Sequence, residues 1–293
     1  MFNKIRLASP LSLAILFMLV GGVSVTFMQA GVKLISADLH PFVVTFFRAF
    51  LVMIVLMPAI AYSGVSVLAT SSIKLQVIRG LVGGSGMVCV FTGLSLVPLA
   101  EATTLLFTVP IFTTVLSVLF LSEKVGNRRW LAIIAGFAGT LVVMRPDLSV
   151  SFGHLLLIYA ALAWALSVLI AKKLTQKDNV LSITFWQAAG SVPIAFILGL
   201  TVWEWPSFEQ LYWLFGIASL GTIGHMLFYA ALQRGDVSFV MPLDYLRIIW
   251  SATLGYLLFG DMPTLQLFVG GAMIIGATTF ISYREMRVRK SAR

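Results

Sequence analysis

Long runs of apolar residues, separated by short polar segments, follow one another along the whole chain. A membrane-spanning helix needs about 20 apolar residues, because it rises about 1.5 Å per residue across a hydrocarbon core of about 30 Å. Ten runs approach or reach this length, at residues 11–32, 41–62, 74–96, 99–121, 129–144, 153–172, 180–203, 208–233, 237–259 and 263–283. The pattern predicts an all-α integral membrane protein with ten transmembrane helices, and it leaves no room for a soluble domain.

The composition and the placement of charge agree with this prediction. Hydrophobic residues make up 59% of the 293 residues and charged residues only 11%, whereas soluble domains carry about 25% charged residues. The net charge of +9 would suit a protein that binds nucleic acid, but the basic residues are distributed as in a membrane protein. If the N-terminus lies inside, Lys33 and Arg145 are the only basic residues of the connecting segments that face outward. Cytoplasmic loops are enriched in Lys and Arg, so we expect both termini on the cytoplasmic side of the inner membrane.

The two halves of the chain resemble each other. A shift of about 137 residues brings similar segments together, namely 91–101 with 228–238 and 119–123 with 257–261. Each half holds five predicted helices, and an odd number turns the second half upside down in the membrane. We therefore expect two inverted five-helix repeats, over residues 11–147 and 153–285, followed by a basic cytoplasmic tail at 286–293.

Motifs around the fourth and fifth predicted helices carry a family resemblance. They are Pro98-Leu-Ala-Glu-Ala-Thr-Thr-Leu-Leu-Phe-Thr-Val-Pro110, Leu121-Ser-Glu123 and Gly136-Phe-Ala-Gly139. With its tandem repeats, the chain resembles the EamA-like transporters of the drug/metabolite transporter superfamily from about residue 11 to 285. The resemblance implies ten helices, cytoplasmic termini, alternating access, a central cavity lined mainly by helices 1 to 4 and 6 to 9, and peripheral helices 5 and 10.

Charged residues inside the predicted helices are the first candidates for function. Four of them stand out, namely Arg48, Glu101, Asp244 and Arg247. A charge at bilayer depth costs at least about 2.5 kcal/mol, so such residues usually pair or line a cavity. Asp244 and Arg247 share a helical face, where substrate or proton handling and a structural pair are both open. Glu101 either has a functional role or caps its helix through the helix dipole. Arg48 either anchors a substrate or forms a structural bond to another helix.

Uncharged candidates complete the predicted site. They are the hydrogen-bonding residues Gln29, Gln187, His225 and Tyr229 and the aromatic residues Trp164, Trp186, Tyr245 and Trp250. Polar residues inside membrane helices either bind a ligand or hydrogen-bond to a neighbouring helix. The aromatic residues lie away from the helix ends, where Trp and Tyr usually collect, so they are either packing residues or the wall of a cavity.

Prolines and small residues predict how the helices bend and pack. We expect Pro58, Pro110, Pro193 and Pro242 to break four of the helices, because proline removes a helical hydrogen bond. The freed carbonyls would need other donors. Small residues spaced by four positions, at 80 and 84 and at 135 and 139, would permit close helix packing.

These features favour a carrier over other classes of protein. The three histidines, His40, His154 and His225, fall on separate segments, and neither a metal-ligand cluster nor a phosphate-binding loop occurs in the sequence. We therefore expect no enzyme, no metal, no cofactor and no direct use of ATP. A passive channel, which usually shows rings of like charge or a filter sequence, stays the alternative class. The expected partners are a small-molecule substrate and membrane lipid rather than nucleic acid, while proton coupling and a homodimer are left open.

The candidate residues and the family resemblance together suggest a planar or ring-bearing polar substrate. Ligand sites commonly combine aromatic walls with a few placed polar groups. Riboflavin uptake is the first expectation, because riboflavin carriers are one branch of the family. S-adenosylmethionine, amino acids or amines, in uptake or efflux, are the alternatives. Two positive and two negative candidate residues can neutralise one another, which counts against a strongly charged substrate.

Overall fold

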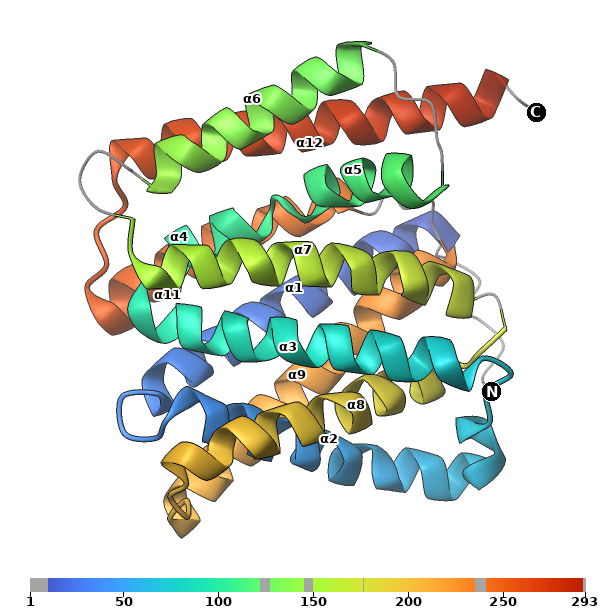
Figure 1. Cartoon of the computed structure of the whole chain (residues 1–293), viewed down its shortest axis with the longest axis vertical. Coiled ribbons are helices and arrows are strands. Elements are labelled where there is room, and N and C mark those ends of the chain that lie inside the picture. The colour runs from blue at the N-terminus through green and yellow to red at the C-terminus, as the bar shows by residue number, and fades with distance from the viewer. Residues whose placement is uncertain (1–9, 122–126, 145–149, 176, 235–240, 292–293) are drawn as a thin grey trace, which may run out of the picture.

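A computed structural model describes residues 10–121, 127–144, 150–175, 177–234 and 241–291, and this part of the chain contains helices and no strand. In chain order the helices are α1 (Pro10–Ile35), α2 (Pro41–Ser63), the 3-10 helix η1 (Val65–Leu68), α3 (Ile73–Leu96), α4 (Leu99–Leu106), α5 (Val109–Leu121), α6 (Asn127–Met144), α7 (Phe152–Leu174), α8 (Val180–Gly199), the 3-10 helix η2 (Leu200–Val202), α9 (Phe208–Arg234), the 3-10 helix η3 (Met241–Leu246), α11 (Arg247–Phe259) and α12 (Leu265–Ser291). They form one bundle, in which the long helices run roughly side by side (Figure 1).

The apolar runs of the sequence correspond closely to these helices. Six of the described helices, α1, α2, α3, α7, α8 and α9, are long and apolar enough to cross a membrane, and shorter apolar helices accompany them. The predicted segments 129–144 and 208–233 coincide with α6 and α9 to within two residues. The helix α12 continues as far as Ser291 and so includes most of the predicted basic tail at 286–293.

Two of the predicted segments, 99–121 and 237–259, are interrupted, as expected from Pro110 and Pro242. The first splits into α4 and α5, because Pro110 has no N–H to donate to the carbonyl of Leu106. The hydroxyl of Thr108 donates to the carbonyl of Leu105 at 2.7 Å and so satisfies one acceptor at the break. In the second, η3 precedes α11, while residues 235–240 lie outside the described part.

Pro58 and Pro193 do not break their helices. Pro58 lies inside α2 and Pro193 inside α8, and both helices continue through the proline. A membrane helix can accommodate an internal proline when neighbouring groups satisfy the freed backbone. Of the four expected breaks, those near Pro110 and Pro242 are therefore found, and residues from both interruptions line the cavity described below.

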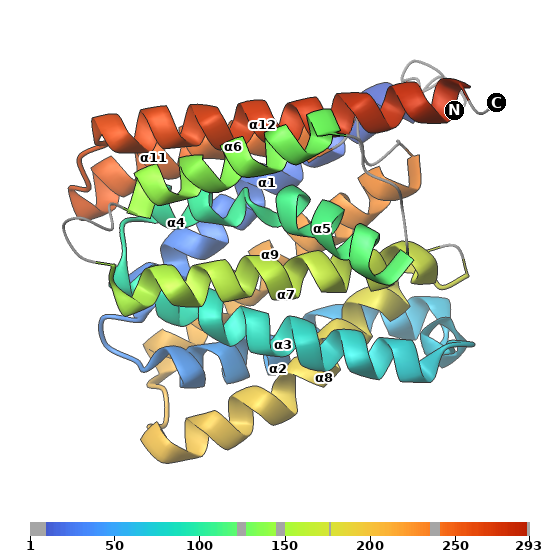
Figure 2. The same cartoon turned by 45° about the horizontal axis from the view of Figure 1, so that its top comes forward.

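The most extensive helix contacts join the first half of the chain to the second. The pairs are α1 with α9, α3 with α7, α6 with α12, α3 with α8, α2 with α8, α2 with α9, α5 with α7 and α4 with α11. In both views α6 and α12 lie side by side along one edge of the bundle (Figures 1 and 2). This is the peripheral position that the family resemblance implies for the fifth and tenth helices.

Glycines allow two of these helix pairs to approach closely. A Cβ atom added to Gly80 would lie 2.8 Å from the Cα atom of Gly190, where α3 crosses α8. A Cβ atom added to Gly139 would lie 2.8 Å from the carbonyl oxygen of Gly270, where α6 crosses α12. Real side chains do not tolerate such distances, so Gly80 and Gly139 mark helix crossings. The predicted pair at 80 and 84 is confirmed, because a Cβ atom on Gly84 would lie 2.7 Å from the Cα atom of Ser191, whereas Ala135 of the second pair is exposed.

Both ends of the bundle can be identified by the helices that meet there. We call the end at which α1 begins and α12 ends the terminal end, and the other the opposite end. Because successive long helices alternate in direction, the connection between α7 and α8 lies at the terminal end, whereas the connections between α3 and α4 and between α11 and α12 lie at the opposite end (Figure 1).

Candidate functional site

A cavity lies between the two halves, at the middle of the long helices. Its lining runs from Phe17 to Gln29 on α1 and from Ala160 to Trp164 on α7, and it includes residues of α3, α9 and α11. The cavity leaves about 110 Å³ for the centres of water-sized molecules, which is room for several waters or for part of a small ligand. The predicted candidates that line it are Gln29, Trp164, His225, Asp244, Tyr245 and Arg247.

The two helix interruptions border this cavity. Leu106 and Phe107 come from the break between α4 and α5, and Asp244 and Tyr245 come from η3. The ring of Phe107 packs edge-on against that of Tyr245 with centroids 5.1 Å apart. Interrupted helices expose backbone groups and turn side chains at membrane depth, and many transporters form their binding sites in this way.

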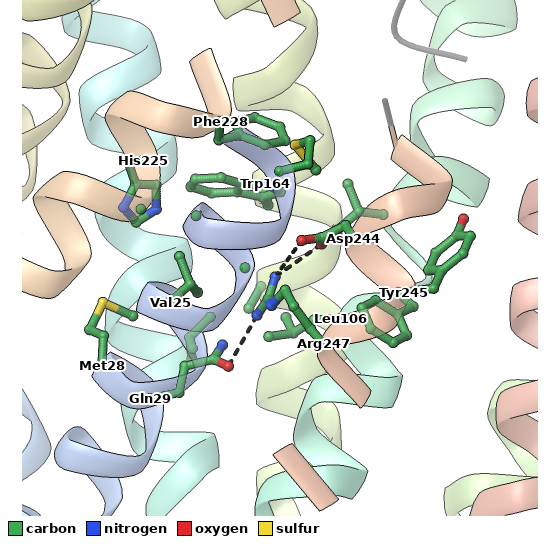
Figure 3. Close-up of a pocket in the computed structure, with 18 of the residues that line it drawn as sticks. Val25, Met28, Gln29, Leu106, Trp164, His225, Phe228, Asp244, Tyr245 and Arg247 are labelled. Atoms are coloured by element: carbon green, nitrogen blue, oxygen red, sulfur yellow. Dashed lines mark hydrogen bonds and ion pairs between the residues drawn. The ribbon is translucent and has the colours of Figure 1, made fainter. Parts of the chain in front are cut away.

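An ion pair with a third partner crosses the cavity. Nη1 of Arg247 donates to Oδ2 of Asp244 at 3.0 Å, as the spacing of three residues predicted. Nη2 of Arg247 donates to Oε1 of Gln29 at 3.0 Å and so connects α11 to α1. Figure 3 shows Arg247 between these two partners. Gly22 leaves space for this arrangement, because a Cβ atom there would lie 3.0 Å from Cγ of Arg247.

The other side of the cavity is formed by an imidazole, an indole and a thioether. The rings of His225 and Trp164 have centroids 5.4 Å apart, and Nδ1 of His225 lies 2.7 Å from the carbonyl oxygen of Gly221. Figure 3 shows His225 and Met28 on the same side of the cavity, away from Asp244 and Tyr245. This side therefore combines aromatic surface with a single polar ring.

Arg48 lies directly behind that side. Its side chain is buried, with 5% of its surface exposed, and Nη2 lies 3.4 Å from Nδ1 of His225 and 3.8 Å from Sδ of Met28. His225 and Met28 both line the cavity. Arg48 from α2 is thus separated from the cavity by these two side chains.

Glu101 does not neutralise Arg48, contrary to the expectation of a self-neutralising set. Glu101 lies at the opposite end of the bundle, where its Oε1 is 2.8 Å from Nε2 of His154. The backbone N–H of Ser151 donates to Nδ1 of the same imidazole at 3.1 Å. The contact comes from α7, a distant segment of the sequence, which is why residue spacing did not reveal it.

Gln187, Tyr229, Trp186 and Trp250 lie outside the cavity lining. Gln187 is buried where α8 meets α3 and accepts a hydrogen bond from Ser167 at 3.4 Å. The indole N–H of Trp186 donates to the carbonyl of Leu68 at 3.1 Å. Trp250 is 45% exposed. Of the four expected aromatic wall residues, the cavity therefore retains Trp164 and Tyr245.

Tyr229 instead bonds to Arg79, which is one of the basic residues expected on the cytoplasmic side. Arg79 is fully buried, and its Nη1 donates to the carbonyl of Ile183 at 2.9 Å. Its Nη2 donates to the hydroxyl of Tyr229, and the guanidinium lies over the tyrosine ring. Its place about two turns inside the predicted helix 74–96 was the signal that could have marked it as buried.

Polar contacts between the two halves hold the opposite end together. Nζ of Lys33 donates to Oδ2 of Asp261 at 3.1 Å and to the carbonyl of Val97 at 2.9 Å. The same carboxylate oxygen accepts a hydrogen bond from the backbone N–H of Leu99 at 3.1 Å, in the first turn of α4. Asp261 therefore connects α1, the start of α4 and the loop before α12.

A second set of contacts joins the halves at the terminal end. Asp178 is buried and accepts hydrogen bonds from the hydroxyl of Thr70 at 2.6 Å and from Nε2 of Gln76 at 2.8 Å. The contact of Trp186 with the carbonyl of Leu68 lies in the same region. Hydrogen bonds between halves thus flank the cavity at both ends. Among the described residues, no three His, Cys, Asp or Glu side chains are grouped as metal ligands.

Comparison with known proteins gives consistent matches over most of the chain. The model of the EamA-like transporter family matches twice, at residues 12–145 and 151–283. The S-adenosylmethionine uptake transporter of Rickettsia prowazekii is 33% identical over 260 residues, which covers 88% of each chain. The riboflavin transporter of Rhizobium johnstonii is 32% identical over 237 residues, covering 79% of this chain and 77% of the relative.

A solved crystal structure shares the fold. It superposes with a TM-score of 0.63 at 18% sequence identity, and the match covers 92% of this chain and 98% of the other.

Proposed function

Because the chain belongs to the EamA-like transporter family, we propose that it carries a small polar metabolite across the inner membrane by alternating access, without direct use of ATP. The observation that carries this proposal is the cavity between the halves, bordered by both helix interruptions and containing the Asp244–Arg247 pair. Such a site near the middle of the helices is typical of secondary transporters.

We propose that the chain crosses the membrane ten times, as two inverted repeats with both termini in the cytoplasm. In this arrangement α4 with α5, and η3 with α11, each make one crossing. The main contacts support the repeat, because they persist when each helix is exchanged for its equivalent in the other half. The exchange converts α1 with α9 into α7 with α3 and α3 with α8 into α9 with α2, and all four pairs are in contact. The pairs α2 with α8, α6 with α12 and α4 with α11 each convert into themselves. The basic residues at the terminal end support this orientation, because the positive-inside rule favours Lys and Arg on the cytoplasmic side. They are Lys74 in the first turn of α3, Lys173 in the last turn of α7 and Lys177 in the connection to α8.

We propose S-adenosylmethionine uptake as the specific activity. The support is the relative of that name, which matches 88% of both chains, together with a cavity that offers an aromatic wall and a carboxylate. Riboflavin is the second candidate, since the riboflavin transporter of Rhizobium johnstonii is 32% identical and the rings of Trp164 and Tyr245 would suit a flavin.

Uptake by proteoliposomes tests this proposal. We expect radiolabelled S-adenosylmethionine to enter vesicles that contain the protein with a rate that saturates, and empty vesicles to take up none. Labelled riboflavin, measured in parallel, separates the two candidates. Uptake of riboflavin alone would replace the proposed substrate, uptake that rises without saturation would indicate a channel, and uptake of neither compound would contradict both assignments.

A further inference from the structure

Arg48 and Arg79 are the two buried arginines for which the described part of the chain supplies no carboxylate partner. The ion pairs among the described residues join Lys33 with Asp261, Arg247 with Asp244, and His154 with Glu101. Arg48 is buried over 95% of its surface. A charge that leaves water in this way needs a counter-charge or several strong hydrogen-bond acceptors.

The acceptors around Arg48 are weak. A thioether such as Met28 accepts hydrogen bonds poorly. Nδ1 of His225 lies 2.7 Å from the carbonyl oxygen of Gly221, and two acceptors would repel each other at this distance. Nδ1 therefore carries a hydrogen and donates it to that carbonyl, so its position 3.4 Å from Nη2 of Arg48 is no hydrogen bond to the guanidinium. Nε of Arg48 has no partner among the described residues.

Arg79 shows how both terminal nitrogens of a buried guanidinium find strong acceptors elsewhere in the same protein, although its Nε, like that of Arg48, has no partner among the described residues. It donates to a backbone carbonyl and to a tyrosine hydroxyl, and it stacks on the tyrosine ring. These contacts account for a structural role within the helix bundle. Arg48 has no comparable set, although the cavity lies just beyond Met28 and His225.

We propose that Arg48 is the anion-binding residue of the cavity and that the transported metabolite carries a carboxylate, which becomes its counter-charge. A guanidinium binds a carboxylate through two parallel hydrogen bonds. Met28 is flexible and unbranched, so its side chain can move aside and open Nη2 to the cavity. This inference rests on the proposed transport function and narrows its substrates to carboxylate-bearing molecules, a class that includes S-adenosylmethionine and excludes riboflavin.

The arrangement of the cavity also orients such a substrate. Figure 3 shows His225 and Met28, which separate Arg48 from the cavity, on the side away from Asp244. A molecule whose carboxylate binds Arg48 places its remaining groups against Trp164 and the Asp244–Arg247 pair. A substrate ammonium group would find the carboxylate of Asp244 there, so a zwitterionic amino acid group matches both sides.

The test compares two competitors that differ only in the carboxylate. Uptake of labelled S-adenosylmethionine into proteoliposomes is measured against unlabelled S-adenosylmethionine and against its decarboxylated form, which keeps the amine, the sulfonium and the adenine ring. We expect the wild type to bind the decarboxylated compound at least about thirtyfold more weakly, because the loss of one partner from a buried charge pair weakens binding strongly. In Arg48→Met the inhibition constants of the two competitors should differ by no more than about threefold, because the carboxylated compound binds this variant more weakly than it binds the wild type.

Controls separate this inference from the proposed function. Lys173→Met removes an exposed cation outside the cavity and should keep the wild-type ratio. Arg48→Lys retains the positive charge and should keep part of the preference for the carboxylated compound. If Arg48→Met folds poorly, this variant provides the measurement instead. Wild-type protein that takes up no S-adenosylmethionine would overturn the proposed substrate. Equal competition by both compounds in a transporting wild type, or unchanged discrimination in Arg48→Met, would overturn the role of Arg48.

Discussion

At the scale of single residues, the pair of Asp244 and Arg247 is the part of the cavity with the most fully formed polar contacts. Arg247 donates to the carboxylate at 3.0 Å and to the amide of Gln29 at 3.0 Å, while both charged side chains keep a minor exposed fraction. Removing one member leaves the other charge without its partner, which destabilises more than removing both.

We therefore expect Asp244→Asn and Arg247→Met each to lower the initial uptake rate by at least about tenfold, equivalent to about 1.4 kcal/mol. The rate is measured in proteoliposomes and divided by the amount of inserted protein, with Lys173→Met as the control for loss of a charge. The double variant should insert at least as well as Arg247→Met alone. Transport at the wild-type rate by both single variants would exclude this pair from the mechanism.

The sequence predicted residue contacts only where the partners are close along the chain. Asp244 and Arg247 are three residues apart, so the helical repeat alone placed them together. The partners of Glu101 and Arg79, by contrast, come from helices that are more than fifty residues away. Helix crossings decide those contacts, and a hydropathy pattern contains no information about which helices cross.

At the scale of helices, the apolar runs predicted where helices lie but not where they are interrupted. The run over 99–121 stays apolar across the break between α4 and α5, since both sides of the break are buried in the same environment. Proline alone did not identify the breaks either, because α2 and α8 continue through Pro58 and Pro193. The backbone conformation at these prolines depends on whether the surrounding helices supply hydrogen-bond donors for the freed carbonyls.

The crossing of α3 and α8 should limit the stability of the fold. A Cβ atom added to Gly190 would collide with backbone atoms of Gly80, and backbone cannot move aside as a side chain can. We expect Gly190→Ala to lower the free energy of unfolding by about 1 to 3 kcal/mol. Gly216→Ala is the matched control, because no atom lies within 4 Å of a Cβ atom at that position, and it should keep or raise the stability.

Thermal unfolding in detergent measures this difference. The midpoint of Gly190→Ala should fall clearly below that of the wild type, whereas the midpoint of Gly216→Ala should equal or exceed it. If the two variants unfolded at the same temperature, the crossing would not be close enough to constrain the fold.

At the scale of the whole molecule, the two halves are interleaved rather than adjacent. The main helix contacts cross between halves, and hydrogen bonds between halves occur at both ends of the cavity, around Asp261 and around Asp178. In alternating access, opening one end requires the contacts of that end to separate while those of the other end stay formed. The proposal therefore assigns the contacts around Asp261 and the contacts around Asp178 to opposite faces of the membrane.

Labelling of single cysteines tests that assignment. The native Cys89 is the only cysteine in the sequence, so a Cys89→Ser background accepts one new cysteine at a time. Lys177 follows α7 near the terminal end, and Glu204 follows α8 at the opposite end, and both side chains are exposed.

An impermeant thiol reagent applied to intact cells should label Glu204→Cys and leave Lys177→Cys unlabelled, because the basic loops remain in the cytoplasm. Permeabilised cells should show labelling at both positions, which proves that each cysteine is reactive. Labelling of Lys177→Cys but not Glu204→Cys in intact cells would reverse the orientation, and would then place the Lys33–Asp261 contact on the cytoplasmic face.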